Sequence, residues 1–511
     1  MYSAILSAQI SGMEILPVSV EADAGDGLPQ FIMVGSLATP VRESQDRIRA
    51  AFRNLRIPLK PLKITVNISP ADLQKTGTGF DLPVALAVLT ASSYLPQDSI
   101  ENVMAVGELS LNGTLNGIRG ILPIAMKAKE TGVRVLFVPR ENLSEARSVT
   151  GLSVIGFSSL REAIDFLQDG VVPPDSGPSP SAAPPLNRYP TDFRDIKGQE
   201  TAKRAALISV SGFHNLLLVG PPGSGKSMLA SRIPTILPSL TLSESLEISR
   251  IYSIAGLIDP DQPLLGTRPF RHPHHTVSPQ ALVGGGKYPV PGEISLAHRG
   301  VLFLDELPEF SRSCLETLRQ PLEDREIIIS RVTGSYRFPA NFLLLAAMNP
   351  CPCGFFPDRT KCRCTENEIH KYQSRLSKPL LDRIDLRVEC PPVSFNDLRG
   401  LGQGGIDSEE LRLHSEEARS IELKRYENTD IHFNSEIPAS SISKYCPLTG
   451  EAEMFLMRTF DSSSLSARAC HKIIRVARTI ADLDGQVVIG KDHIMEAFLY
   501  RTPDSIQPLH S

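Results

Sequence analysis

The sequence of 511 residues contains no tryptophan, and its longest apolar run, FLLLAAM at 342–348, spans only seven residues. A membrane-spanning helix needs about 20 consecutive apolar residues, so the sequence predicts none. The first sixteen residues lack Lys and Arg, and serine and glutamine interrupt the apolar ones, so we expect no secretory signal. These absences predict a cytoplasmic protein without membrane partners, in which thiols stay reduced and disulfide bonds are rare.

The sequence also lacks an excess of basic residues, since its formal net charge is −4. A polyanionic partner would therefore have to be recognised by a local patch. One candidate is VRESQDRIRAAFRNLRIPLKPLK at 41–63, which holds seven Lys/Arg against two acids. If this segment is a helix, one of its faces is basic and the opposite face is apolar. The basic face is either a solvated surface over a core or a contact for DNA phosphates, and its members are Arg42, Arg49, Arg53 and Arg56.

Proline is concentrated in VVPPDSGPSPSAAPPLNRYP at 171–190, which has seven prolines in twenty residues. Such a segment cannot build a helix or a sheet and behaves as an extended spacer. We therefore expect an N-terminal domain over 1–170, an α/β domain over 191–398 and, after a Gly-rich polar stretch, a helical lid over 408–511.

The N-terminal 170 residues show a mixed α/β pattern, in which strand-like runs alternate with helical ones. The predicted strands are KITVNI (63–68), VMAVGEL (103–109) and VRVLFVP (133–139), and the predicted helices are LPVALAVLTASS (82–93) and LPIAMKAKETG (122–132).

Two stretches of this region, 72–89 and 106–142, resemble the proteolytic domain of Lon, an S5-like α+β fold shared with the C-terminal domain of RadA-type recombination proteins. Lon proteases use a serine that a lysine activates. On that pattern the serine position falls on Gly79 and the lysine position on Leu122. Since neither residue can do this chemistry, the resemblance implies a peptidase-derived scaffold without peptidase activity.

A phosphate-binding motif, G-x-x-x-x-G-K-[ST], lies between an apolar strand NLLLVG (215–220) and a helical segment SMLASRIPTIL (227–237). Its backbone N–H groups would wrap the phosphates at a helix N-terminus. We expect its lysine to reach the β- and γ-phosphates and its serine to ligate Mg²⁺. The motif consists of Gly220, Pro221, Pro222, Gly223, Ser224, Gly225, Lys226 and Ser227.

A second apolar strand, VLFLDE at 301–306, ends on two acids. Asp305 is placed to hold Mg²⁺, directly or through water, and Glu306 to orient and deprotonate an attacking water. The pair predicts hydrolysis of ATP, with GTP as the less favoured nucleotide.

Three further residues resemble elements of AAA+ ATPases. The strand FLLLAAMN ends on Asn349, where these enzymes carry the sensor 1 residue. SKPLLDRIDL at 377–386 resembles the segment that carries the arginine finger in Mg-chelatase and MCM-type proteins, which implies that Arg383 acts on the nucleotide of a neighbouring subunit. Arg468 lies at the position of the sensor 2 arginine. The alternative for either arginine is a surface ion pair.

Two insertions also match the Mg-chelatase/MCM clade, in which they line the pore of a hexameric ring. One is a Pro/Gly/His-rich segment at 268–300, and the other, 325–342, predicts a hairpin that turns at Thr333-Gly334-Ser335. Their cations are Lys287, Arg331 and Arg337, which the ring would place as DNA contacts and which would otherwise be ordinary loop charges. The run HPHH could suggest a metal, but adjacent prolines and the lack of a fourth ligand disfavour one.

Taken in order, these segments resemble the ComM/YifB family of Mg-chelatase-like AAA+ proteins along nearly the whole chain. The resemblance implies a hexameric DNA helicase that drives branch migration in recombination or natural transformation, with ATP and Mg²⁺ as cofactors. The alternatives are a chelatase-type ATPase that works on a tetrapyrrole-pathway partner, a protein-remodelling machine and an ATP-dependent protease, the last disfavoured by Gly79 and Leu122.

Half of the eight cysteines lie in NPCPCGFFPDRTKCRC at 349–364. Their C-x-C-x₈-C-x-C spacing can close a tetrahedral zinc site, which would be structural because four cysteines leave no open position for water. Unligated thiols and a redox-sensitive disulfide are the alternatives. The four residues are Cys351, Cys353, Cys362 and Cys364.

Overall fold

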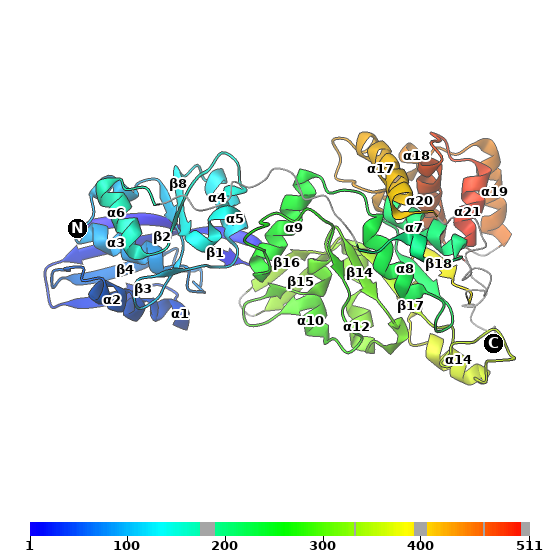
Figure 1. Ribbon diagram of the computed structural model, residues 1–511, viewed down its shortest axis with the longest axis horizontal. Coiled ribbons are helices and arrows are strands. Elements are labelled where there is room, and N and C mark those ends of the chain that lie inside the picture. The colour runs from blue at the N-terminus through cyan, green and yellow to red at the C-terminus, as the bar shows by residue number, and fades with distance from the viewer. Residues whose placement is uncertain (174–189, 332–333, 393–405, 463–464, 502–511) are drawn as a thin grey trace.

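The computed structural model describes residues 1–173, 190–331, 334–392, 406–462 and 465–501. The Pro-rich segment falls almost entirely outside these ranges, as do Thr333 and most of the Gly-rich stretch before the helical lid. Figure 1 shows an elongated molecule with an N-terminal sheet at one end, a second sheet in the middle and C-terminal helices beyond it. Within the described ranges, every helix is too short or too polar to cross a lipid bilayer.

The N-terminal region is built on a mixed sheet of seven strands in the order β3-β4-β2-β1-β5-β8-β9. β1 and β2 form a long antiparallel hairpin, β2 pairs antiparallel with β4, and the remaining pairs are parallel. The sequence did not predict this hairpin. The strands are β1 Tyr2–Ser11, β2 Glu14–Gly25, β3 Gln30–Val34, β4 Lys63–Ser69, β5 Val103–Ala105, β8 Val135–Pro139 and β9 Ser153–Phe157, with a small ribbon of β6 Glu108–Leu109 and β7 Leu115–Asn116.

The helices of this region cover the sheet, and α3 is buried along its whole length because its residues are almost all apolar. Its single carboxylate, Asp81, accepts two hydrogen bonds from the guanidinium of Arg47, at 2.7 and 2.9 Å. A buried charge of this kind is tolerated only when it is paired. The helices are α1 Thr39–Arg42, α2 Ser44–Asn54, α3 Asp81–Ala91, α4 Ile121–Glu130, α5 Leu143–Arg147 and α6 Leu160–Asp169.

The central sheet has five parallel strands in the order β11-β14-β17-β10-β18. Its three inner strands, β14, β17 and β10, are continuously apolar, as expected of strands that helices cover on both faces. The strand order places β17 between β10 and β14. The strands are β10 Leu216–Val219, β11 Phe270–Arg271, β14 Val301–Leu304, β17 Leu343–Met348 and β18 Leu386–Glu389.

The helix after β10 is shorter than the sequence predicted. It ends at Arg232 and continues as a 3₁₀ turn because Pro234 cannot donate a backbone hydrogen bond. The helices around this sheet are α7 Glu200–Gly212, α8 Lys226–Arg232, α9 Leu242–Ala255, α10 Pro279–Val283, α11 Glu293–Leu296, α12 Arg312–Thr317, α13 Pro321–Asp324, α14 Glu366–Gln373 and α15 Lys378–Leu381. Two antiparallel hairpins project from it, β12 Gly284–Gly285 with β13 Val290–Pro291, and β15 Glu326–Arg331 with β16 Gly334–Pro339.

The C-terminal helices pack on α7 and share one hydrophobic core with the central sheet. A largely buried ion pair joins the two parts, since Nζ of Lys472 lies 2.6 Å from a carboxylate oxygen of Asp385. Burial would raise the pKa of Asp385, but Lys472 and His214 hold it below its ordinary value. The helices are α17 Ser408–Arg425, α18 Ile442–Tyr445, α19 Gly450–Ser462, α20 Ala467–Leu483 and α21 Lys491–Leu499.

The N-terminal region contacts the central part through α4, α5 and α9. The backbone N–H of Gly120 donates to the carbonyl of Ser253 at 3.0 Å. The Ser253 hydroxyl in turn donates to the carboxylate of Glu145, whose pKa burial raises above its ordinary value. Ser144 adds a bond from its hydroxyl to the carbonyl of Pro260, 2.7 Å long. The two parts are therefore held by polar contacts as well as by the linker.

Replacing Asp385 by Asn should destabilise the protein, because it leaves the ammonium of Lys472 buried without its counter-charge. We expect the free energy of unfolding to fall by about 3 kcal/mol, seen as a lower melting temperature. The native carboxylate has a depressed pKa, so its contribution is present at neutral pH and is lost as the pH falls below about 4.

The matched control is Glu130→Gln, which removes an exposed ion pair with Lys127. That variant should melt as the wild type does, since exposed pairs contribute little. Equal melting temperatures for the two variants would contradict the role assigned to Asp385.

Candidate functional site

The phosphate-binding loop, residues 220–227, connects the end of β10 to α8. Gly223 and Gly225 adopt φ of +77° and +89°, a region that favours glycine, so the loop can turn its backbone toward a bound anion. Nζ of Lys226 donates to the carbonyls of Gly220 and Pro221, at 2.7 and 2.9 Å. These bonds hold the ammonium over the loop before any phosphate arrives.

The strand order brings two sequence-distant residues, Asp305 and Asn349, to this loop. The hydroxyl of Ser227 donates to Asp305 at 2.6 Å, and Nζ of Lys226 lies 3.2 Å from Oδ1 of Asn349. Asp305 follows β14 and Asn349 follows β17, so both lie at the carboxyl edge of the sheet, beside the loop after β10. Burial lowers the pKa of Lys226 below its ordinary value. A phosphate would replace the neutral oxygens around Lys226 with charged ones.

Glu306 has a backbone conformation that its residue type rarely adopts. Its φ is +51°, and its N–H donates to the carboxylate of Asp305 at 2.9 Å. Strain of this kind collects at functional sites. The Glu306 carboxylate lies 3.3 Å from Nδ1 of His275. In the sequence, the HPHH run suggested only a metal site. Within the described ranges, the one cluster of residues that could bind a metal ion is made of cysteines.

Arg383 and Arg468 lie side by side, because both donate to the carboxylate of Glu323. Burial alone would raise the pKa of Glu323, but the two guanidinium groups hold it below its ordinary value. Glu323 belongs to α13, a short helix before the β15–β16 hairpin, and no sequence motif marked it. Both arginines therefore form ion pairs in the isolated chain, Arg468 at the surface and Arg383 largely buried.

Arg383 also lies at the wrong edge of the sheet to reach the phosphate loop of its own chain. Its carbonyl accepts a bond of 2.9 Å from the side-chain amide of Asn215, the residue before β10. The loop starts at the other end of β10, whose four residues span about 13 Å. In one chain, the arginine pair and the loop occupy opposite edges.

The two inserted hairpins lie next to each other. Nε of Arg331 lies 3.4 Å from the carbonyl of Gly286, in the loop between β12 and β13. Lys287 in that loop is exposed and lies over the ring of Tyr288, and Arg337 is exposed and pairs with Glu326 at 3.2 Å.

The predicted turn of the second hairpin is wrong in position. Gly334 pairs with Arg331, and Ser335 pairs with Ser330, so both belong to β16. Thr333, the first residue of that predicted turn, lies outside the described ranges.

The four arginines of the basic face are all exposed, but they do not share one helix. Only Arg49 and Arg53 belong to α2, because α1 ends at Arg42 and Arg56 follows α2 with a φ of +52°. The prediction that the four arginines share one helical face is therefore wrong. The opposite side is buried as predicted, at Val41, Ile48 and Phe52.

The Lon-like positions contain no catalytic groups. Leu122 is buried in an apolar cluster, and Gly79 borders a cavity of about 490 Å³ between the N-terminal sheet and the two hairpins. Hydroxyls of Ser11, Thr76 and Thr78 line this cavity, but among its described lining residues there is no lysine to activate them.

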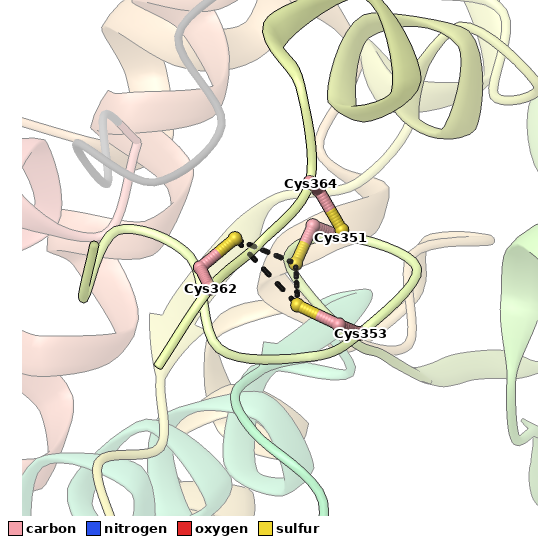
Figure 2. Close-up of side chains that lie close together, drawn as sticks. All are labelled: Cys351, Cys353, Cys362 and Cys364. Carbon is pink, nitrogen blue, oxygen red and sulfur yellow. Dashed lines mark hydrogen bonds between the residues drawn. The ribbon is translucent and has the colours of Figure 1, made fainter. Parts of the chain in front are cut away.

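The four clustered cysteines converge, as Figure 2 shows, in the loop between β17 and α14. Their sulfur atoms all lie within 4.8 Å of one another. Every cysteine of the chain is a free thiol, so the structure contains no disulfide at this loop.

Two substitutions separate nucleotide binding from hydrolysis. Lys226→Ala should abolish nucleotide binding, because it removes the ammonium that the loop holds in place. Glu306→Gln should keep binding and lower ATP hydrolysis by about 10²–10⁴-fold, since it removes a general base. Nucleotide titration and phosphate release measure the two steps.

Glu309→Gln is the matched control, because Glu309 lies three residues farther on and is exposed in a pair with Arg375. Loss of hydrolysis in this control, or normal hydrolysis in Glu306→Gln, would contradict the assignment.

Comparison with known proteins finds magnesium-chelatase-like proteins similar to each part of the chain. Family models described as magnesium chelatase subunit ChlI match residues 20–142, 192–398 and, for its C-terminal part, 405–501. The chain is 40% identical over 501 residues to the competence protein ComM of Haemophilus influenzae, covering 97% of each. It is also 40% identical to the uncharacterized protein YifB of Escherichia coli over 495 residues, 97% of this chain and 96% of that one.

More distant is the magnesium-chelatase 38 kDa subunit of Rhodobacter capsulatus, which is 28% identical over 189 residues, 34% of this chain and 53% of that subunit. The first two relatives are 40% identical to this chain over almost its full length, and the chain carries the phosphate-binding loop. The chain therefore belongs to the ComM/YifB family of magnesium-chelatase-like AAA+ ATPases.

Proposed function

We propose that this protein is a cytoplasmic ATP-driven motor that assembles into a hexameric ring and moves along DNA, driving branch migration in recombination or natural transformation. The observation that carries the proposal is the full-length similarity to a protein named for competence, combined with the contacts that Asn349 and Asp305 make with the phosphate-binding loop.

The residues around the loop fit ATP and Mg²⁺. Ser227 and Asp305 present a hydroxyl and a carboxylate 2.6 Å apart, the hard oxygen ligands that Mg²⁺ prefers, and would hold the ion. When bound, Mg²⁺ neutralises charge on the phosphate oxygens. Lys226 binds the terminal phosphates, Asn349 orients the attacking water beside them, and Glu306 accepts its proton. His275 fixes the Glu306 carboxylate from the side.

The arginine pair supports a ring. Arg383 cannot reach the loop of its own chain, and a second subunit docked against the loop can supply it. Glu323 holds Arg383 and Arg468 together, so both guanidinium groups would arrive at the neighbour's phosphates as one unit. An arginine finger stabilises the charge that develops on the transferred phosphoryl group. Hydrolysis would then depend on assembly.

The hairpins supply the DNA surface in this proposal. The two adjacent hairpins carry three cations, Lys287, Arg331 and Arg337. Among the described residues, only Arg337 of the three has a carboxylate partner. In a ring these cations would track phosphates in the pore, and the exposed arginines at 42, 49, 53 and 56 would add contacts from the N-terminal region. Each neutralised phosphate makes the affinity more salt-dependent.

Three other functions remain as alternatives. A chelatase-type ATPase on a tetrapyrrole-pathway partner is supported by the family models, but the Rhodobacter capsulatus subunit is similar over only 34% of this chain. A protein-remodelling ATPase would use the same hairpins. An active Lon-type protease is disfavoured by Gly79, Leu122 and the cavity that has no lysine.

ATP turnover should rise severalfold when forked or single-stranded DNA is added, and the stimulation should weaken with salt. Phosphate release with and without DNA, over a range of salt, measures this, and Lys226→Ala should show no turnover in either case. Equal turnover with and without DNA would contradict the motor.

Lys287→Ala should weaken DNA stimulation while leaving DNA-free turnover unchanged. Lys444→Ala is its control, because Lys444 is also an exposed lysine over a tyrosine ring, that of Tyr445 in the C-terminal helices. Stimulation reduced equally in both variants would argue against a contact at the hairpin.

Mixing two inactive variants tests whether Arg383 acts between subunits. Arg383→Ala should lower hydrolysis about 10³-fold or more, and Lys226→Ala should be inactive because it binds no nucleotide. In mixed rings, an intact loop on one subunit can meet an intact arginine on the next, so activity should return.

Analytical ultracentrifugation should confirm that both variants assemble with the wild type. Mixed rings as inactive as the separate variants would show that Arg383 does not complete a neighbour's site.

A further inference from the structure

We propose that Cys351, Cys353, Cys362 and Cys364 bind one Zn²⁺ ion, and that the closed loop braces the phosphate-binding loop through Gly354. The proposed ATPase site does not require this metal, and its family assignment does not supply one. The inference rests on the sulfur geometry, on the make-up of the loop and on its contact with Pro222.

The sulfur atoms are spaced as zinc requires. In a tetrahedral site with Zn–S bonds of about 2.3 Å, the sulfurs lie about 3.8 Å apart. Cys351 lies 3.4 Å from Cys353 and 3.8 Å from Cys362, and the last two are 3.5 Å apart. Disulfide-bonded sulfurs would be about 2.05 Å apart. All four sulfurs fall within 4.8 Å of one another, the arrangement that one ion in their midst would need.

The loop has few other means of holding its shape. Between the end of β17 and the start of α14, it has no helix or strand. Its small apolar cluster contains the four cysteines with only Phe356 and Ile369. Loops of more than about 12 residues without secondary structure are uncommon in compact domains unless they are functional. A metal that crosslinks both ends of this loop would provide the missing stability.

The surroundings suit a thiolate site, which carries two negative charges when it holds Zn²⁺. The backbone N–H of Phe356 points at Sγ of Cys351, 3.4 Å away. Arg359 donates to the carbonyl of Cys364 at 3.1 Å, and Lys361 and Arg363 flank Cys362 in the sequence. Such outer groups orient and neutralise metal ligands.

The metal loop touches the nucleotide site at one point. Gly354, with a φ of +85°, packs so closely on Pro222 that a methyl group there would overlap the proline ring. Pro222 lies in the phosphate-binding loop, and Asn349 stands two residues before Cys351. Closing the cysteines around zinc would therefore fix both the phosphate loop and the residue that contacts Lys226.

Metal analysis of the full-length protein, purified without a metal-affinity step, tests the site itself. We expect one zinc ion per chain by mass spectrometry, and the visible spectrum of a tetrahedral cobalt thiolate after exchange with Co²⁺. The Cys362→Ser/Cys364→Ser double variant should lose the metal. Cys470→Ser should retain it, because Cys470 lies in α20 and does not belong to the cluster. Zinc well below one per chain, with four thiols that titrate freely, would overturn the proposal.

Gly354→Ala tests the brace without removing a ligand. It should keep its zinc and lower kcat/KM for ATP by about 10- to 100-fold, the cost expected of a displaced catalytic group. Gly132→Ala is the matched control and should hydrolyse ATP normally. Gly132 also has a positive φ, +72°, but a Cβ added there would meet no atom within 4 Å.

Neither assay uses DNA, so the result does not depend on the substrate of the motor. A Gly354→Ala protein that holds zinc and hydrolyses ATP as the wild type does would overturn the brace. A wild type that holds zinc but hydrolyses no ATP under any condition would contradict the proposed function and leave the metal site intact.

Discussion

The contact between Lys226 and Asn349 is the interaction around which this protein is arranged. It exists because β17 pairs in parallel with both β10 and β14, which brings the residue after β17 to the loop after β10. The same pairing places Asp305 on the other side, against Ser227. Strands that are apolar throughout can take this position only with helices on both faces. The order of the buried strands thus sets the positions of the charged residues.

The same sheet separates Arg383 from the phosphate-binding loop. Residues after β10, β14 and β17 lie at this loop, whereas Arg383 precedes β18 and lies at the opposite edge. The strand between them spans about 13 Å, so Arg383 does not reach the loop of its own chain. Glu323 keeps Arg383 and Arg468 paired, which shields two cations from each other in the separate chain.

The loop from Asn349 to Cys364 joins these features. It starts at the residue that contacts Lys226 and returns beneath Pro222, before the chain continues to Arg383. The two hairpins face the N-terminal region across a cavity that Gly79 borders. The phosphate-binding loop and the cysteine loop are therefore in direct contact, through Pro222 and Gly354.

The sequence by itself determined the local chemistry. The glycine pattern of 220–227, the apolar strands that end in Asp305 and Asn349, and the four close cysteines each follow from residue type and spacing, because backbone conformation and ligand chemistry act over a few residues. It failed where tertiary contacts decide. The long β1–β2 hairpin was missed because serine and glutamine mask its alternation, and the basic segment was split at Glu43 rather than forming one helix.

Only the tertiary structure showed that Glu323 joins two arginines, that His275 contacts Glu306, and that Gly354 packs on Pro222. These pairs are separated by 31 to 145 positions, and nothing in the local sequence of either partner encodes the other. Long-range proximity is set by the pairing and packing of whole strands and helices, which is why the fold and not the motif decides it.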